Sequence, residues 1–106
     1  MSVTVLLTFV VTTDDTSAFR ETISELAKRV QRMPGALRYA VYQGADDPDY
    51  FHVHQVWANR GCYQAYINST EAAAAFASLR GIVSELLVKE LTPVANSDST
   101  PVLVAV

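Results

Sequence analysis

The sequence predicts an α+β fold in which helices cover one face of a single antiparallel β-sheet. Apolar, β-branched runs alternate with amphipathic segments of helical period along the 106 residues, in the order β-α-β-β-α-β. Two of these runs are separated only by "GADDPD", residues 44–49, a turn too short for anything but a hairpin. This order is typical of the ferredoxin-like arrangement. Because the chain is this short, we expect one domain.

The first strand and the first helix are predicted from the N-terminal third of the chain. Residues 3–11, "VTVLLTFVV", are almost continuously apolar, which indicates a strand buried on both faces. A helix is expected from a cap at Thr16 or Ser17 to about Met33, where Pro34-Gly35 ends it. Its apolar residues recur in alternating steps of four and three: Phe19, Ile23, Leu26, Val30 and Met33.

Two further strands are predicted, at residues 36–43, "ALRYAVYQ", and within residues 49–57, "DYFHVHQVW", where the strand ends at Trp57. On the former, Leu37, Tyr39 and Val41 share one face. The latter is unusual because both of its faces carry aromatic rings and polar groups. One face holds Phe51, Val53, Gln55 and Trp57, and the other holds Tyr50, His52, His54 and Val56. We therefore expect a different environment on each side of this strand.

The C-terminal half is expected to hold a helix in two pieces and a fourth strand. "NRGCYQAYIN", residues 59–68, predicts a short helix, and Ser69 or Thr70 caps the next one. The buried stripe of that second piece is predicted to be Phe76, Leu79, Val83 and Leu86. Residues 88–95, "VKELTPVA", are read as the fourth strand. Residues 1–95 then form the domain, and 96–106 form a polar linker and an apolar C-terminal strand.

The apolar pattern on both faces of the strands predicts a homodimer. Two helices cover only one face of the sheet, and a bare apolar face of that size marks an association site. The simplest partner is a second copy of the chain, and the C-terminal strand is expected to pair with the partner's sheet edge. A net charge of −3 without a basic run argues against nucleic acid and membrane partners. The single cysteine, Cys62, suits a cytoplasmic protein.

The run from Gly35 to Phe76, "GALRYAVYQGADDPDYFHVHQVWANRGCYQAYINSTEAAAAF", resembles the antibiotic biosynthesis monooxygenase (ABM) family of dimeric α+β barrels. That family shows a helix ending in Pro-Gly, an "lryevy" strand, an Asp-Asp-Pro turn and a strand ending in Glu-x-Trp, and the resemblance covers about residues 3–95. It implies a pocket between sheet and helices within each protomer, into which Trp57 points. His52, His54 and Val56 would then face the barrel between protomers.

The resemblance implies a cofactor-independent monooxygenase that oxidises a phenolic or polycyclic, anthrone-like substrate to a quinone, with O₂ as co-substrate. Its catalytic candidates are Trp57 as a stacking wall, Tyr63 as a group that holds or relays a proton, and Tyr66. Each of the first two has an equally good structural explanation: Trp57 as an aromatic residue of the core, and Tyr63 as a surface residue of an amphipathic helix. Tyr66 stands where haem-degrading members carry a histidine ligand, so haem degradation is not expected.

The substrate-binding candidates are Phe51, Val53, Gln55, Phe76 and Arg80. Val53 stands where anthrone oxygenases carry an asparagine, and valine cannot stabilise an oxyanion. Gln55 replaces a common glutamate; it can donate hydrogen bonds but cannot take a proton. Arg80 follows the Phe76 stripe and either reaches the pocket mouth or remains solvated.

Other functions and sites stay open at this point. The same pocket fits a non-catalytic ligand-binding dimer, or an isomerase or cyclase acting on a small keto or polyketide intermediate. His52 and His54 can ligate a metal as His-x-His, but the sequence offers no third histidine, so we expect no metal site and interface histidines instead. A general-base role for either one requires the strand to face the other way.

Overall fold

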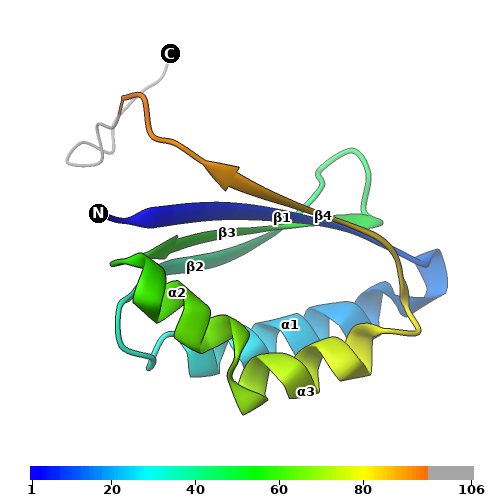
Figure 1. Cartoon of the computed structure of the whole chain (residues 1–106). Helices are drawn as coiled ribbons and strands as arrows, with labels where there is room; N and C mark the ends of the chain where they lie inside the picture. Colours follow the sequence, from blue (N-terminus) through cyan, green and yellow to red (C-terminus); the bar gives the residue numbers. More distant parts are fainter. Residues whose placement is uncertain (96–106) are drawn as a thin grey trace.

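The computed structural model describes residues 1–95, which form one antiparallel sheet with helices packed on one side (Figure 1). The predicted C-terminal strand and its linker lie outside the described residues. The elements in chain order are β1 (Val3–Val11), η1 (Thr13–Asp15), α1 (Thr16–Val30), β2 (Ala36–Gln43), β3 (Tyr50–Trp57), α2 (Arg60–Ile67), α3 (Thr70–Leu79) and β4 (Val83–Leu91).

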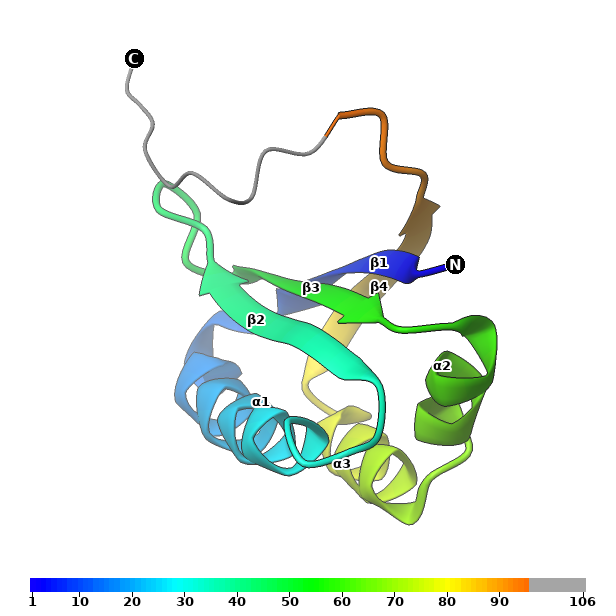
Figure 2. The ribbon, with the colours of Figure 1, turned by 90° about the vertical axis from the view of Figure 1, so that its left-hand side faces the viewer.

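The strands are ordered β2-β3-β1-β4, and every neighbouring pair is antiparallel. All three α-helices lie on one face of the sheet, and no described helix covers the opposite face (Figure 2). The predicted ferredoxin-like α+β fold is therefore confirmed. No helix among residues 1–95 is long and apolar enough to cross a membrane.

The core lies between the sheet and α1. Burial alternates along β1, because every second side chain points to the helices. Four of the five apolar positions predicted for the first helix are buried on α1: Phe19, Ile23, Leu26 and Val30. The fifth, Met33, follows the helix and is half-buried. The ring of Phe19 packs between Phe9 and Phe51, with centroids 5.0 and 4.5 Å away. The outward residues of β1 are only half-buried, so burial on both faces is not reached within one chain.

The boundary between α3 and β4 differs from the prediction. The helix ends at Leu79, and Val83 and Leu86 lie on β4, which begins five residues before the predicted start at Val88. The run after Gly81 fits both a helical and a strand period, and pairing with β1 decides for the strand. Leu79 is buried on α3 as predicted, Phe76 is half-buried, and the other buried residues of α3 are Ala72 and Ala75.

Two smaller differences concern α1 and β2. Helix α1 ends at Val30, three residues before the predicted end, and Asp15 occupies its N-cap position without a side-chain hydrogen bond. Leu37 is exposed, because a register irregularity between Ala36 and Arg38 removes it from the alternation. The predicted cap at Ser69 is confirmed, because its side chain accepts from the backbone N–H of Ala72. The side chain of Asn59 caps α2 by accepting from the backbone N–H of Cys62.

Candidate functional site: a cleft beside β4

A cleft of about 280 Å³ opens between the sheet and helices α2 and α3. It exists because the helices leave the inner face of β4 uncovered: Leu86 and Val88 point to the helix side, yet are 46% and 57% exposed. The lining is mostly apolar, and its residues are Leu7, Gln55, Tyr63, Tyr66, Ile67, Phe76, Leu86 and Val88.

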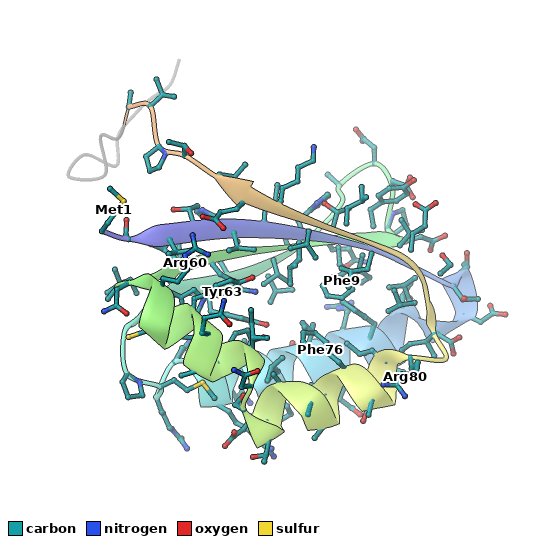
Figure 3. The ribbon with its side chains drawn as sticks, viewed as in Figure 1. Met1, Phe9, Arg60, Tyr63, Phe76 and Arg80 are labelled. Atoms are coloured by element: carbon teal, nitrogen blue, oxygen red, sulfur yellow. The ribbon has the colours of Figure 1, made fainter. Side chains whose placement is uncertain are left out.

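A second hollow of about 220 Å³ continues the cleft along β4, and the two share Phe76 and Leu86. Phe9 and Phe76 face one another here between the sheet and α3 (Figure 3). Arg80 lies at the end of α3 and also lines this hollow. The open side of the inner sheet face is therefore one apolar trough with a cation at one end.

A polar network of four side chains lies at the inner wall of the cleft. The indole N–H of Trp57 donates to Oε1 of Gln55 over 2.9 Å, and both side chains are buried. The Trp57 indole stacks on the ring of Tyr66, with centroids 5.0 Å apart and planes inclined by 22°. The hydroxyls of Tyr66 and Tyr39 are 3.1 Å apart, within hydrogen-bonding distance. Tyr66 thus joins the cleft to the core behind it.

The phenols of this region are held in their neutral form. Burial raises the pKa of the Tyr66 hydroxyl; the hydrogen bond with Tyr39 opposes this rise, and Tyr63 adds to it. Burial raises the pKa of Tyr39 even more strongly. Burial also raises the pKa of Tyr63, and the nearby Glu90 adds to the rise. At neutral pH these side chains are hydrogen-bond donors and not bases.

An ion pair joins α2 to β4 beside Tyr63. Arg60 donates to both carboxylate oxygens of Glu90, with Nη1 to Oε1 at 3.1 Å, and Arg60 and Tyr63 lie on the same side of α2 (Figure 3). The hydrogen bond from Arg60 lowers the pKa of the Glu90 carboxyl. The Glu90 carboxylate is therefore a weaker base than an unpaired one.

The structure brings together some of the predicted site residues and separates others. Gln55, Tyr63, Tyr66 and Phe76 line the cleft, and Arg80 lines the adjoining hollow. Three predicted residues are fully buried and form no part of either lining: Phe51, Val53 and Trp57. Trp57 lies behind Tyr66, where it does not present its ring to the cleft as a stacking wall would.

Sequence reasoning missed Tyr39 and the walls that β1 and β4 provide. Tyr39 pairs with Gln55 in the β2–β3 register, which places it next to the polar network. The alternation of β2 puts Tyr39 on a face, but only the strand pairing identifies which residue lies beside it. Leu86 and Val88 were missed because the sequence places the first on a helix.

His52 and His54 point away from the cleft, to the uncovered face of the sheet. His52 Nδ1 is 3.1 Å from the hydroxyl of Thr8, and Nε of Arg38 donates to Nδ1 of His54 over 3.1 Å. Neither imidazole reaches the cleft, so a general-base role there is excluded by geometry. Among residues 1–95 no group of three or more His, Cys, Asp or Glu side chains forms a metal site.

Several solved structures share this fold. The protein Rv0793 from Mycobacterium tuberculosis superposes with a TM-score of 0.85 at 18% identity, covering 92% of this chain and 99% of its own. PA3566 from Pseudomonas aeruginosa gives 0.83 at 15% identity, with 89% and 95% covered. A Nitrosomonas europaea protein provisionally assigned as an antibiotic biosynthesis monooxygenase gives 0.79 at 23% identity, with 85% and 86% covered.

At these identities the structural likeness establishes the fold, and the sequence family is established separately. No curated protein matches the chain. The family model for antibiotic biosynthesis monooxygenases matches residues 2–78, which include β1, all three α-helices up to Ser78, and the residues of the polar network. The chain therefore belongs to the antibiotic biosynthesis monooxygenase family.

Proposed function

We propose that the chain is a cofactor-independent monooxygenase that oxidises a phenolic or polycyclic, anthrone-like substrate to a quinone. Family membership supports a monooxygenase-like function in general. The observation that carries the finer proposal is the cleft, whose apolar and aromatic walls hold only three polar side chains: Gln55, Tyr63 and Tyr66. Together with the adjoining hollow it falls within the size range of ordinary small-molecule pockets, roughly 300 to 1,000 Å³.

The reaction needs little covalent chemistry from the protein. The bound phenol or anthrone loses a proton, and the resulting carbanion passes one electron to O₂. The substrate radical and superoxide combine to a peroxide, which loses water and leaves a new carbonyl. One oxygen atom of O₂ thus enters the quinone, while the other leaves as water with the two hydrogens lost by the substrate. The protein orients the ring, excludes bulk water and stabilises the oxyanion.

The cleft residues supply donors for that oxyanion. Trp57 contacts both Gln55 and Tyr66, and Tyr63 lies one turn before Tyr66 on α2. Phe76 offers an aromatic surface to the substrate ring, and Arg80 can attract a second oxygen at the far end. Because the lining holds no carboxylate or imidazole, the first proton passes to water at the cleft mouth. Tyr63 and Tyr66 are accordingly assigned to oxyanion stabilisation and not to proton abstraction.

We also propose that the protein is a cytoplasmic homodimer that pairs through the uncovered sheet face. Members of this family are generally dimeric, and Figure 2 shows that no described helix covers this face. Apolar side chains recur across it, and they include Leu6, Tyr42, Val56, Leu87 and Leu91. Exposed to water, these side chains would form a large apolar patch of the kind that marks a protein–protein association site.

Oxygen uptake with a panel of anthrones and naphthols tests the proposed reaction. We expect uptake above the rate of spontaneous oxidation and a matching yield of quinone, without added metal or flavin. The lack of a base in the cleft lining favours one alternative, a ligand-binding dimer without turnover. Tight binding of the same compounds with no uptake would establish that alternative. An isomerase or cyclase would instead convert a keto substrate under nitrogen.

A further inference from the structure

We infer that Trp57 is a positioning residue that fixes the carboxamide of Gln55, so that the cleft selects flat ligands carrying a hydrogen-bond acceptor oxygen, a carbonyl or a phenolate. This rests on the proposed function in that it names the substrate class of the same cleft. It assigns Trp57 an indirect role, through Gln55, in place of contact with the substrate.

The orientation of the Gln55 amide follows from the chemistry of its neighbour. An indole nitrogen can only donate a hydrogen bond. Trp57 Nε1 lies 2.9 Å from Gln55 Oε1, and the exposed fractions of the two residues are 0% and 1%. Turning the amide over would put its NH₂ group against the indole N–H and leave a buried donor without an acceptor. The amide oxygen must therefore face Trp57.

Fixing the oxygen leaves the amide nitrogen of Gln55 to face elsewhere. Within residues 1–95 no protein acceptor takes its N–H groups, whereas every fully buried side-chain nitrogen or oxygen in the same range has a partner. The nitrogen is therefore not sealed in the core. Because Gln55 lines the cleft, we expect this nitrogen to be the part of the amide that donates to a molecule bound there.

The neighbouring hydroxyls reinforce the same preference. Tyr66 lines the cleft, and its hydroxyl is 3.1 Å from that of Tyr39, so one phenol donates to the other. If Tyr39 donates, the Tyr66 proton points to the ligand, and an acceptor oxygen completes the chain of hydrogen bonds. A ligand that offers only N–H groups would face the Gln55 donors without an acceptor. The remaining walls are apolar, which suits a flat hydrocarbon body.

Three planar tricyclic probes of nearly equal shape test this selection: fluorenone carries a carbonyl acceptor, carbazole an N–H donor, and fluorene neither. We expect the wild-type protein to bind fluorenone at least tenfold more tightly than the other two. Gln55→Leu should reduce fluorenone binding to the level of fluorene. Trp57→Phe keeps an aromatic ring but releases the amide, so carbazole should gain affinity and the fluorenone-to-carbazole ratio should approach one.

Val5→Ala is the matched control, because Val5 is buried, pairs with Gln55 in the sheet and does not line the cleft. It should lower the melting temperature without changing the ratio. Gln55→Glu, which replaces donors by acceptors, should favour carbazole and covers the case in which Trp57→Phe fails to fold. A folded Trp57→Phe protein that keeps the wild-type ratio would overturn the positioning role, and equal wild-type binding of all three probes would overturn the selection.

The binding assay also separates this inference from the proposed reaction. If the protein prefers fluorenone through Gln55 and Trp57 but oxidises no anthrone, the selection of acceptor ligands is supported and the proposed oxygenase activity is refuted. Quinone formation with no preference among the probes would support the oxygenase activity and refute the selection of acceptor ligands. If none of the three probes binds, the selection is overturned, while quinone formation from anthrones still decides the proposed reaction.

Discussion

At the scale of single residues, the site depends on four side chains that the alternation of β3 only partly predicts. The sequence places Gln55 and Trp57 on one face of a strand, and the structure confirms that face. The sequence could not show that the two side chains form a hydrogen bond, since neighbours on one strand face often do not. Nor could it show that Tyr39 and Tyr66, 27 positions apart, meet hydroxyl to hydroxyl, because that contact depends on how α2 packs on the sheet.

Removing the Tyr66 hydroxyl should separate catalysis from packing. Tyr66→Phe keeps the ring that stacks on Trp57 but leaves the Tyr39 hydroxyl buried without its partner, which should cost about 1 to 3 kcal/mol of unfolding free energy. Quinone formation should fall by at least about tenfold, with substrate binding less affected. Chemical denaturation and steady-state rates measure the two effects.

The control is Tyr39→Phe, which breaks the same hydrogen bond from the other side, outside the cleft lining. The double variant should be less destabilised than the sum of the two single variants, because they share one interaction. If the losses of unfolding free energy in the two single variants add up to the loss in the double variant, the two hydroxyls do not interact.

His54 should make stability depend on pH. Partial burial, followed by the charge of Arg38, lowers the pKa of its imidazole in the folded protein. The unfolded chain then binds the proton more readily, so stability is highest above the unfolded value of about 6.5 and falls as pH drops below it. His54→Ala should flatten this part of the melting curve against pH while leaving ligand affinity unchanged. A loss of ligand binding with the fold intact would invert the assigned faces.

At the scale of elements, glycines decide two boundaries. Gly81 precedes β4, and overlooking it extends the predicted helix into residues that pair with β1. Pro34-Gly35 is predicted to end the first helix, and the structure gives the reason for a glycine at the second position. Gly35 has φ of 78°, and a Cβ there would clash with Sγ of Cys62 on α2. The turn after α1 therefore packs directly against the start of the helix that carries Tyr63 and Tyr66.

Substituting Gly35 should accordingly be costly where substituting Gly81 is not. Gly35→Ala combines a left-handed backbone with a steric clash, and we expect a loss of about 1 to 3 kcal/mol in unfolding free energy. Gly81→Ala is the matched control, because a Cβ at that position meets nothing within 4 Å. Thermal and urea denaturation should rank the two variants clearly. Equal stability would mean that the turn relaxes away from α2.

At the scale of the whole molecule, the sequence predicted the order of elements along the chain, helices on one face of the sheet and an uncovered opposite face. The family resemblance implied a pocket between the sheet and the helices, but it could not show that this pocket opens along β4, because the opening depends on how far two short helices extend across a four-stranded sheet. The sequence pattern marks Leu86 and Val88 as apolar, and only the assembled structure shows them on the helix side yet uncovered. Incomplete helix cover on one face leaves the trough, and the lack of any described helix on the other leaves that sheet face open.

The uncovered sheet face predicts the state of assembly. Sedimentation should give about twice the 11.6 kDa mass of the chain at micromolar concentration. Leu87→Glu places a charge on the outer face of β4, beside Thr8, and should shift the protein to monomer. Ala73→Glu introduces the same charge on the exposed side of α3 and should not. A wild-type monomer would refute pairing through the sheet.

The most direct measurement is isotope labelling of the product under ¹⁸O₂ with an anthrone substrate, in buffer free of metal and flavin. The proposed reaction requires one labelled oxygen atom in the quinone and one in water, at a rate well above spontaneous oxidation. It also requires that Tyr66→Phe and Gln55→Leu, if folded, slow the labelled product, and that Ala73→Glu does not. Label incorporation that never exceeds the protein-free rate, with the anthrone still bound in the cleft, would contradict a monooxygenase acting at this site.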